Sequence, residues 1–243
     1  MTRPKPEKPD IREHGSPRDG QPQAMDRRLF VQLQAFGDCH DTAPLIDALR
    51  EAEITGVLYE DVQDPRGVAL VTAAEDPAVF LDVIRPMLNR APFASLTHKP
   101  EFAMFGRTYA IGYEPDLQEA LFDRPTRTIL NPQWPWAVWY PLRRKGEFEQ
   151  LSAEVRRGVL MEHGTIGRAF GEADLAHDVR LVSTGLDTHD NDFVIGLTGS
   201  QLHPLSAIVQ RMRSTQQTSL YLEKLGPFFV GRVCWQSAVA PDA

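Results

Sequence analysis

Cysteine is scarce in this chain of 243 residues, which contains only Cys39 and Cys234, far apart and outside any CxxC pattern. This usage argues against a disulfide framework or a thiolate cluster, and it is typical of the reducing cytoplasm. Net positive charge is also lacking: the formal net charge is −7, which argues against a general affinity for nucleic acid. No apolar run approaches the roughly 18 to 20 residues that cross a bilayer. We therefore expect a cytoplasmic protein without a membrane span. Glycine-rich phosphate loops and serine or cysteine nucleophile motifs are missing as well, which disfavours nucleotide chemistry and acyl transfer.

The first 25 residues contain five prolines and mixed charges but almost nothing that can be buried. Such a stretch cannot offset its chain entropy by burial, so we expect residues 1–25 to form a disordered tail. It also lacks the apolar region of a secretory signal. Met25, directly before the first expected strand, is an alternative start of the protein.

Two copies of one pattern follow, each alternating β-rich runs with amphipathic helices. In the first copy we expect a strand at 27–36, a helix at 42–53, strands at 54–62 and 66–74, a helix at 76–90 interrupted at Pro86, and a strand at 101–111. In the second we expect a strand at 135–142, a helix at 147–163, strands at 177–184 and 192–199, a helix at 202–213 and a strand at 228–236. Each copy has the order β-α-β-β-α-β of a ferredoxin-like domain.

The repeat predicts an α+β fold made of two ferredoxin-like β-α-β-β-α-β modules, with antiparallel sheets and helices on one face. We expect the N-terminal module at residues 26–111, a linker at 112–133 and the C-terminal module at 134–238. The linker carries a short helix over residues 116–122 and a proline-rich stretch. The two modules share a pattern but little residue identity.

The helix expected at 147–163 carries the most informative side chain. Its apolar positions, three or four residues apart, form one stripe. They are Phe148, Leu151, Val155 and Val159. His163 is the next position on this stripe, and Gly164 is a natural C-terminal cap. The pattern thus directs an imidazole from the end of a helix into an apolar cavity, as a haem iron needs from its proximal ligand. The acidic neighbour Glu162 is a candidate to make that imidazole more basic.

A structural role for His163 is the competing interpretation. A single histidine on an apolar stripe is more often a hydrogen-bonded core residue than a ligand, so spacing alone favours that interpretation. The other six histidines form no HxxxH or HxH pair, which argues against a zinc site.

An ordered set of short motifs changes that balance. In chain order they are Gly112-Tyr113-Glu114-Pro115-Asp116-Leu117, Tyr140-Pro141-Leu142 with Arg143-Arg144, Glu162-His163-Gly164, Ile166-Gly167-Arg168, Ser183-Thr184-Gly185-Leu186-Asp187 with Phe193, Arg211-Met212-Arg213-Ser214-Thr215, and Gly226-Pro227-Phe228-Phe229-Val230-Gly231-Arg232. No single motif is specific, but the set over about a hundred residues resembles the C-terminal half of the chlorite dismutase superfamily. That superfamily includes the coproheme decarboxylases of haem synthesis. The N-terminal half resembles it mainly in layout.

The resemblance implies an architecture, a cofactor and partners. In this superfamily the two ferredoxin-like modules form an α+β barrel with helices outside, and only the C-terminal module binds haem. Subunits usually assemble into homo-oligomers, most often pentamers. The implied cofactor is haem with its iron, either coproheme III or haem b. The implied partners are this porphyrin and hydrogen peroxide or chlorite.

By position, His163 corresponds to the proximal iron ligand, and Arg144 to the basic residue beside a propionate. Phe148 stands where relatives often have tryptophan, so a hydrogen-bond donor is missing there. A guanidinium pairs with a carboxylate in a bidentate fork, although a solvated surface charge is an equal interpretation of Arg144. Tyr109 and Arg127 are further propionate candidates.

Tyr140 bears on the choice of reaction. In decarboxylases of the superfamily a tyrosine directly before proline on this strand forms the radical that attacks the propionate, and Tyr140-Pro141 matches. The lysine that relatives have four residues later is Arg144 here. Simple packing on a half-buried strand is the alternative for this aromatic side chain.

The distal residue is left open among four positions. Counting back from Gly185 gives Asp178, whereas counting forward from His163 gives Ala176. Arg180 shares a strand face with Asp178 and would reach the pocket from a bulged strand, and His177 would do so in another register. A distal arginine would stabilise a hypochlorite-like leaving group. A distal aspartate would act as acid or base towards peroxide, as in dye-decolourising peroxidases.

Four functions follow from these residues. The first is peroxide-driven decarboxylation of coproheme III, with Tyr140 as radical relay and Arg144 as propionate anchor. The second is another haem oxidoreductase, either a chlorite dismutase that uses Arg180 or a peroxidase-like enzyme that uses Asp178. The third is a haem carrier or sensor without turnover. The fourth is a module without cofactor, in which His163 is structural.

Overall fold

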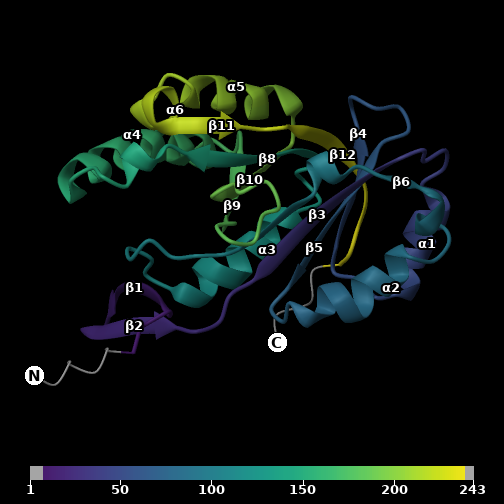
Figure 1. The fold of residues 1–243 in the computed structure, drawn as a ribbon, viewed down its shortest axis with the longest axis horizontal. Helices are drawn as coiled ribbons and strands as arrows, with labels where there is room; N and C mark the ends of the chain where they lie inside the picture. The colour runs from purple at the N-terminus through teal and green to yellow at the C-terminus, as the bar shows by residue number, and fades with distance from the viewer. Residues whose placement is uncertain (1–7, 239–243) are drawn as a thin grey trace, which may run out of the picture.

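The computed structural model of this chain describes residues 8–238. Its first module runs through β3 (Phe30–Gly37), α1 (Ala43–Glu51), β4 (Gly56–Asp61), β5 (Val68–Ala74), a π-helix (Phe80–Ile84) that continues as α2 (Arg85–Leu88), and β7 (Met104–Arg107). Its second module runs through β8 (Trp136–Arg144), α4 (Ala153–Glu172), β9 (His177–Val182), β10 (Phe193–Gly199), α5 (Leu202–Met212) and β12 (Phe229–Gln236). Both modules therefore have the expected order of strands and helices (Figure 1).

The strands of the two modules close into one antiparallel barrel. The first module has the strand order β7-β3-β5-β4, and the second has β9-β10-β8-β12. At one seam β4 pairs with β12 along much of both strands, from Val57–Gln236 to Asp61–Gly231. At the other seam β7 meets β9 through a single pair, Arg107 with Val182. The α+β fold of two ferredoxin-like modules with antiparallel sheets is confirmed.

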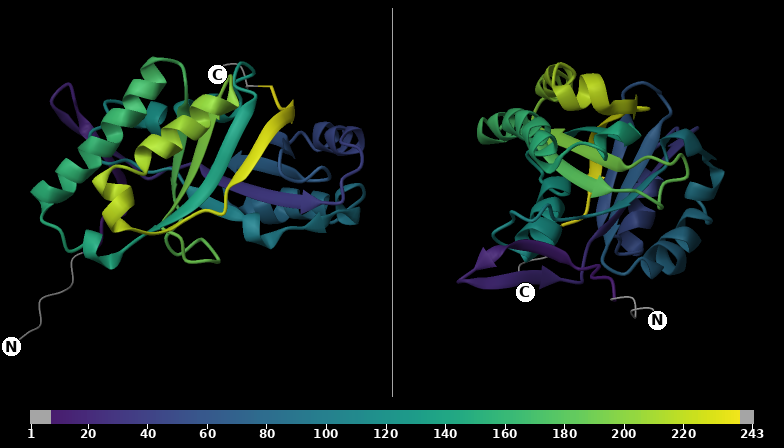
Figure 2. Two further views of the ribbon diagram at one scale, coloured as in Figure 1. Left: turned by 90° about the horizontal axis from the view of Figure 1, so that it is seen from above. Right: turned by 60° about the vertical axis from the view of Figure 1, so that its left-hand side comes forward.

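The helices cover the outside of the barrel in two groups. Helices α1 and α2 lie over the first module, where Leu45 and Leu49 join an apolar cluster with β4 and β5. Helix α5 packs on β8 and β10, and α4 lies against α5 and β9. Figure 2 shows the two groups on different sides of the barrel. No helix within residues 8–238 is both long and apolar enough to cross a membrane.

Further short elements connect this frame. They are the hairpin β1 (Glu13–Arg18) and β2 (Gln21–Met25), β6 (Thr97–His98), the 3-10 helices Phe93–Ser95, Pro100–Phe102 and Gly146–Phe148, the π-helix Glu119–Asp123 with α3 (Arg124–Ile129), α6 (Gln216–Tyr221) and β11 (Leu222–Leu225). Each π-helix ends two residues before a proline, Pro86 or Pro125. Proline has no N–H for the regular helical bond, so the preceding turn widens to bonds of the i→i+5 type.

The expected disordered tail at residues 1–25 is wrong where the structure describes it. Residues 13–25 form the hairpin β1–β2, whereas residues 1–7 lie outside the described part. Besides Met25, which packs against the core, polar contacts hold the hairpin: the Glu13 carboxylate binds Arg107, and the Ser16 backbone N–H donates to the Glu114 carbonyl at 2.9 Å. Amino-acid composition indicates only how much of a segment can be buried, so it could not predict these long-range polar contacts.

The helix expected at 147–163 begins and ends later, as α4 over Ala153–Glu172. Its N-cap is Ser152, whose side chain accepts a hydrogen bond from the Val155 N–H at 3.3 Å. Gly164 therefore lies inside the helix and is not its C-cap, because one glycine costs a helix only about 1 kcal/mol. Val155 is 49% exposed, so the expected stripe is not continuously buried.

Trp139 on β8 and Gly196 on β10 are directly paired, and the fully buried indole fills the barrel interior beside the glycine. A Cβ at position 196 would lie 2.5 Å from the nearest indole carbon. Glycine is required here because the indole occupies the space of a side chain.

We predict that Gly196→Ala lowers the free energy of unfolding by about 1–3 kcal/mol, because the added methyl overpacks the barrel. Urea denaturation of the purified apoprotein measures this change. Gly158→Ala is the matched control: it lies on α4 with open space around it, and it should be neutral or stabilising. Equal stabilities of the two variants would contradict the packing role of Gly196.

Candidate functional site

Strand pairing puts the expected site residues on one outer face of the second module. Ile195 on β10 is paired with Tyr140 on β8 and with Arg180 on β9. Leu197, two residues further, is paired in the same way with Val138 and Asp178. Side chains opposite one another in a sheet point to the same face. Tyr140 and Leu197 belong to the apolar cluster that also receives side chains from α4 and α5.

The β9 register places the four distal candidates on different faces. Pairing between β9 and β10 is continuous from His177 to Val182, without a bulge, so Asp178 and Arg180 both face outward without the bulge considered above. His177 points to the other face, where its ring stacks on Trp134 with centroids 3.5 Å apart and bonds Asp174 at 2.7 Å. Ala176 precedes the strand and is buried in the outer cluster.

Asp178 and Arg180 form an ion pair. Arg180 Nε lies 2.9 Å from Asp178 Oδ2, and both side chains are partly exposed. The carboxylate of Asp178 raises the pKa of the Arg180 guanidinium. The outer face therefore presents a fixed cation next to a carboxylate.

His163 projects from the middle of α4 and remains partly accessible. Its Nδ1 lies 3.4 Å from Thr215 Oγ1, and that hydroxyl donates its proton to the Met212 carbonyl at 2.8 Å. With the hydroxyl donating to Met212, Thr215 Oγ1 accepts from His163 in the tautomer that carries the proton on Nδ1, and this tautomer leaves the Nε2 lone pair free.

Glu162 does not serve as the carboxylate partner of His163. Its Oε2 accepts from the Gln216 N–H at 3.0 Å and so binds the start of α6. The second nitrogen of the imidazole is therefore held by a neutral alcohol, which polarises the ring less than a carboxylate would.

The charges around His163 act on its imidazole in opposite directions. Burial lowers the pKa of His163, and the charges of Arg144 and Arg180 lower it further, whereas Asp178 opposes them. A lowered pKa keeps the imidazole neutral at pH 7, which is the form that ligates metals. Burial also raises the pKa of Tyr109, against the effect of Arg180 and Arg144.

Arg144 is a largely buried cation without a carboxylate partner. Its Cζ lies 4.4 Å from the Phe148 ring centroid and 4.5 Å from that of Phe193. Its Nε is buried without a hydrogen-bond partner, and within residues 8–238 no ion pair neutralises it. Burial lowers the pKa of this guanidinium. A desolvated cation of this kind favours an anionic ligand, so the solvated-surface interpretation of Arg144 does not fit.

Tyr140 is only 8% exposed and packs against Phe228, with ring centroids 4.7 Å apart. Burial and the nearby charge of Asp178 raise its pKa. The phenol is therefore fully protonated at neutral pH.

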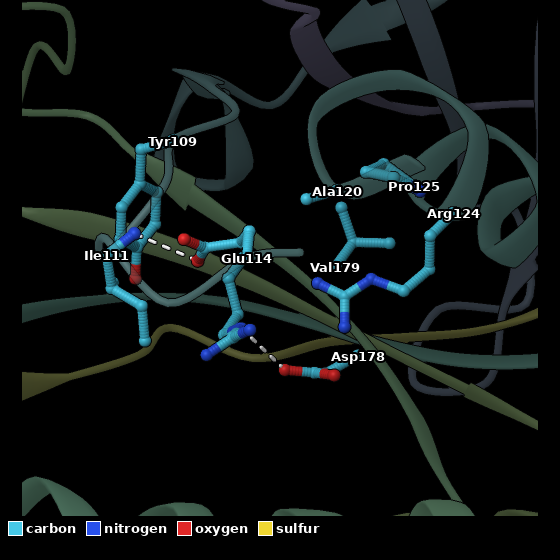
Figure 3. A pocket seen from close by; sticks show the side chains of 9 residues that line it. Tyr109, Ile111, Glu114, Ala120, Arg124, Pro125, Asp178 and Val179 are labelled. Carbon is cyan, nitrogen blue, oxygen red and sulfur yellow. Dashed lines mark hydrogen bonds and ion pairs between the residues drawn. The ribbon is translucent and has the colours of Figure 1, made fainter. Parts of the chain in front are cut away.

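A small enclosed cavity of about 10 Å³ adjoins the ion pair, which is room for about one water. Its lining consists of Tyr109, Ile111, Glu114, Ala120, Arg124, Pro125, Asp178, Val179 and Arg180. Tyr109 lies on one side and Arg124 on the other (Figure 3). Tyr109 comes from the loop after β7, because the strand expected at 101–111 spans only Met104–Arg107.

Glu114 and Arg124 were not foreseen as residues of this site, and no local sequence signal separates Arg124 from Arg127. Arg127 itself forms a bidentate ion pair with Glu119, at 2.6 and 3.0 Å. Arg124, three residues earlier, lines the cavity instead, and its Nε is buried without a hydrogen-bond partner. The expectation that Arg127 faces a propionate does not agree with these contacts.

The residues present fit a flat apolar group that carries carboxylates. Helix α4 has 20 residues, of which only Val159 is buried, and its apolar residues Leu160 and Met161 are exposed. His163 offers one free nitrogen and Arg144 an unneutralised guanidinium. No three His, Cys, Asp or Glu side chains in the described chain come together to hold a bare metal ion. A porphyrin, which supplies four of its own ligands to iron, matches this set.

Comparison with known proteins shows the family of this chain. The family model for chlorite dismutase matches residues 70–234. The chain belongs to the chlorite dismutase family. In this chlorite dismutase family member the match runs from β5 to β12 and includes the whole candidate site.

Solved structures share the fold of this family member at low sequence identity. A haem-binding protein from Thermus thermophilus has a TM-score of 0.68 and 20% identity, over 85% of this chain and 91% of that one. A chlorite dismutase variant from Candidatus Nitrospira defluvii has a TM-score of 0.66 and 16% identity, over 86% and 92%. A putative chlorite dismutase, TA0507, has a TM-score of 0.67 and 12% identity, over 85% and 94%. No curated protein sequence matches this chain.

We predict that His163 in the apoprotein titrates below the ordinary histidine pKa of about 6.5 and that Arg144→Gln raises this value. Removing one positive charge makes protonation easier, while burial still opposes it. An NMR titration of the His163 ring measures both. Arg143→Gln is the control, because Arg143 pairs with Asp190 at 2.8 Å and does not act on His163. Equal changes of the His163 pKa in the two variants would contradict the conclusion that the Arg144 charge acts on His163.

Proposed function

We propose that this protein is a haem-dependent oxidoreductase that binds coproheme III through His163 and uses hydrogen peroxide to decarboxylate two of its propionates. The observation that carries the proposal is the shared outer face, on which the neutral phenol of Tyr140 lies in register with Arg180. Arg144, without a carboxylate partner, supports a ligand that carries propionates.

Each decarboxylation balances with one peroxide. The propionate loses a hydrogen atom and its carboxylate, which leaves as carbon dioxide, and becomes a vinyl group. One hydrogen peroxide and one proton are converted to two waters. The iron of the bound porphyrin supplies the two-electron chemistry with peroxide.

The side chains of this chain have separate tasks in that reaction. His163 would hold the porphyrin iron through Nε2, while Thr215 orients the imidazole ring through Nδ1. Arg144 holds a propionate in a charge-assisted pair. Tyr140 gives up an electron and a proton and then takes a hydrogen atom from the propionate side chain. We assign Asp178, whose charge acts on Tyr140, as the base that accepts the phenol proton of Tyr140. Arg180 orients the peroxide.

A chlorite dismutase is the second candidate. The observation that favours it is the outward-facing guanidinium of Arg180, held at 2.9 Å by Asp178, because a distal cation stabilises a hypochlorite-like leaving group. In that case Tyr140 is a packing residue, and the reaction releases oxygen from chlorite.

We predict that protein reconstituted with coproheme loses carbon dioxide from the porphyrin on addition of peroxide, and that Tyr140→Phe abolishes this loss. Phenylalanine retains the packing on Phe228 but cannot form the radical. Mass spectrometry of the extracted porphyrin measures the reaction. Tyr113→Phe, at an exposed tyrosine, is the control.

Unchanged decarboxylation in Tyr140→Phe would refute the radical assignment. Oxygen release from chlorite, lost in Arg180→Gln, would replace the first function by the second. A porphyrin complex that consumes neither oxidant and passes its porphyrin to an acceptor would indicate a carrier.

We predict that His163→Ala abolishes the Soret band and that Thr215→Val weakens haem affinity by about 10- to 100-fold, the range for lost partners of metal-bound histidines. Valine retains the shape of threonine but cannot accept the Nδ1–H bond. Thr215→Ser retains the hydroxyl and should bind like the parent. Absorbance titration with haem measures the affinity, and a Thr215→Val protein that binds like the serine variant would contradict the role of Thr215.

A further inference from the structure

Glu13 on β1 is a nearly buried carboxylate that joins the N-terminal hairpin to the barrel. Its side chain is 11% exposed, and its Oε1 accepts from Arg107 Nη1 at 2.7 Å. Its Oε2 accepts from the Ala110 backbone N–H at 2.9 Å. Hydrogen bonds to an ionised carboxylate are about twice as strong as neutral ones, so Glu13 fixes the end of β7 and the loop that follows.

The hairpin also binds the far end of the same loop. Ser16 donates to the Glu114 carbonyl from both its N–H and its hydroxyl, at 2.9 and 3.1 Å. Gln23 Nε2 donates to the Pro115 carbonyl at 2.9 Å. In Figure 1 the hairpin accordingly lies beside the segment that leads to α3. The loop at 107–116 is therefore held at both ends by β1 and β2.

The same loop forms one wall of the cavity beside the Asp178–Arg180 pair. Tyr109, Ile111 and Glu114 all line that cavity and are drawn together in Figure 3. The Glu114 carboxylate accepts from the backbone N–H groups at positions 111, 112 and 113, at 2.9 to 3.0 Å. These three hydrogen bonds hold the turn at 111–114 together.

The barrel holds the start of this loop at Thr108, which exchanges hydrogen bonds with Leu29 at 2.8 and 2.9 Å, but the adjoining seam between the modules is weak. Arg107 is the last residue of β7, and its pairing with Val182 is the single ladder pair between β7 and β9. The same Arg107 is the residue whose guanidinium Glu13 binds. The contacts of Glu13 therefore act where the backbone pairing of the barrel is weakest.

We propose that Glu13 is a positioning residue for the distal side of the site. It holds the loop at 107–116 so that Tyr109 and Glu114 close the cavity against Arg180, and it thereby restricts access of small ligands to the iron. The part that concerns iron access rests on the proposed function, whereas the positioning of the loop does not.

The first test is amide hydrogen exchange of the apoprotein, which needs no cofactor. Glu13→Ala should speed exchange in residues 107–116 by about tenfold, and Glu13→Gln, which can still accept one bond, should give a smaller increase. Glu75→Ala is the matched control: Glu75 forms a bidentate pair with Arg27 at 2.6 and 2.8 Å and contacts no residue of the loop. Unchanged exchange in Glu13→Ala would overturn the proposal.

The second test measures imidazole binding to the haem-loaded protein by stopped flow. Glu13→Ala should raise the association rate by about tenfold, with the Soret maximum and haem affinity unchanged, because only the distal wall is loosened. Glu75→Ala should match the parent. Faster amide exchange in Glu13→Ala without faster imidazole association would overturn the proposal that Glu13 restricts ligand access to the iron.

The two tests also separate the proposals. A parent protein that takes up no haem would refute the proposed function, and the exchange experiment would still decide the role of Glu13. A parent that takes up haem, with a Glu13→Ala variant equal to Glu75→Ala in both assays, would refute the positioning role alone.

Discussion

The packing of Trp139 against Gly196 sets the register in which β8 and β10 pair, and the site depends on that register. Side chains alternate along a strand, so a slip by one residue would exchange the two faces of the sheet. With the indole inside the barrel, Tyr140 must point outward. The same ladder extends to β9 and directs Arg180 outward as well. One buried contact thus orients residues that never touch it.

The order of strands and helices was predictable because it depends on periodicity, which is a local property of the sequence. Both modules repeat it, and the alternation of apolar residues in β3 marks its buried face. The bounds of α4 were not predictable from Gly164, since a glycine in a helix is only a weak stop signal. Local periodicity therefore gives the topology but not the position of His163 within its helix.

The polar contacts of the site were the least predictable part. The hairpin β1–β2 is held by Glu13 and Ser16, which find partners about 90 to 100 residues away along the chain. The same problem affects Arg124 and Arg127, which lie three residues apart yet have different surroundings. Such pairings depend on the complete fold, so composition and spacing contain no information about them. His163 became a candidate ligand only because a family resemblance added to its ambiguous spacing.

The unequal seams of the barrel have a consequence for how the protein loosens. Local opening proceeds where few backbone hydrogen bonds must break, and the β7–β9 junction contributes a single pair whereas β4–β12 contributes a ladder. Partial unfolding should therefore begin beside the candidate site and leave both modules joined along their opposite edge. In such a partly open form a bound cofactor would be released before the chain itself unfolds.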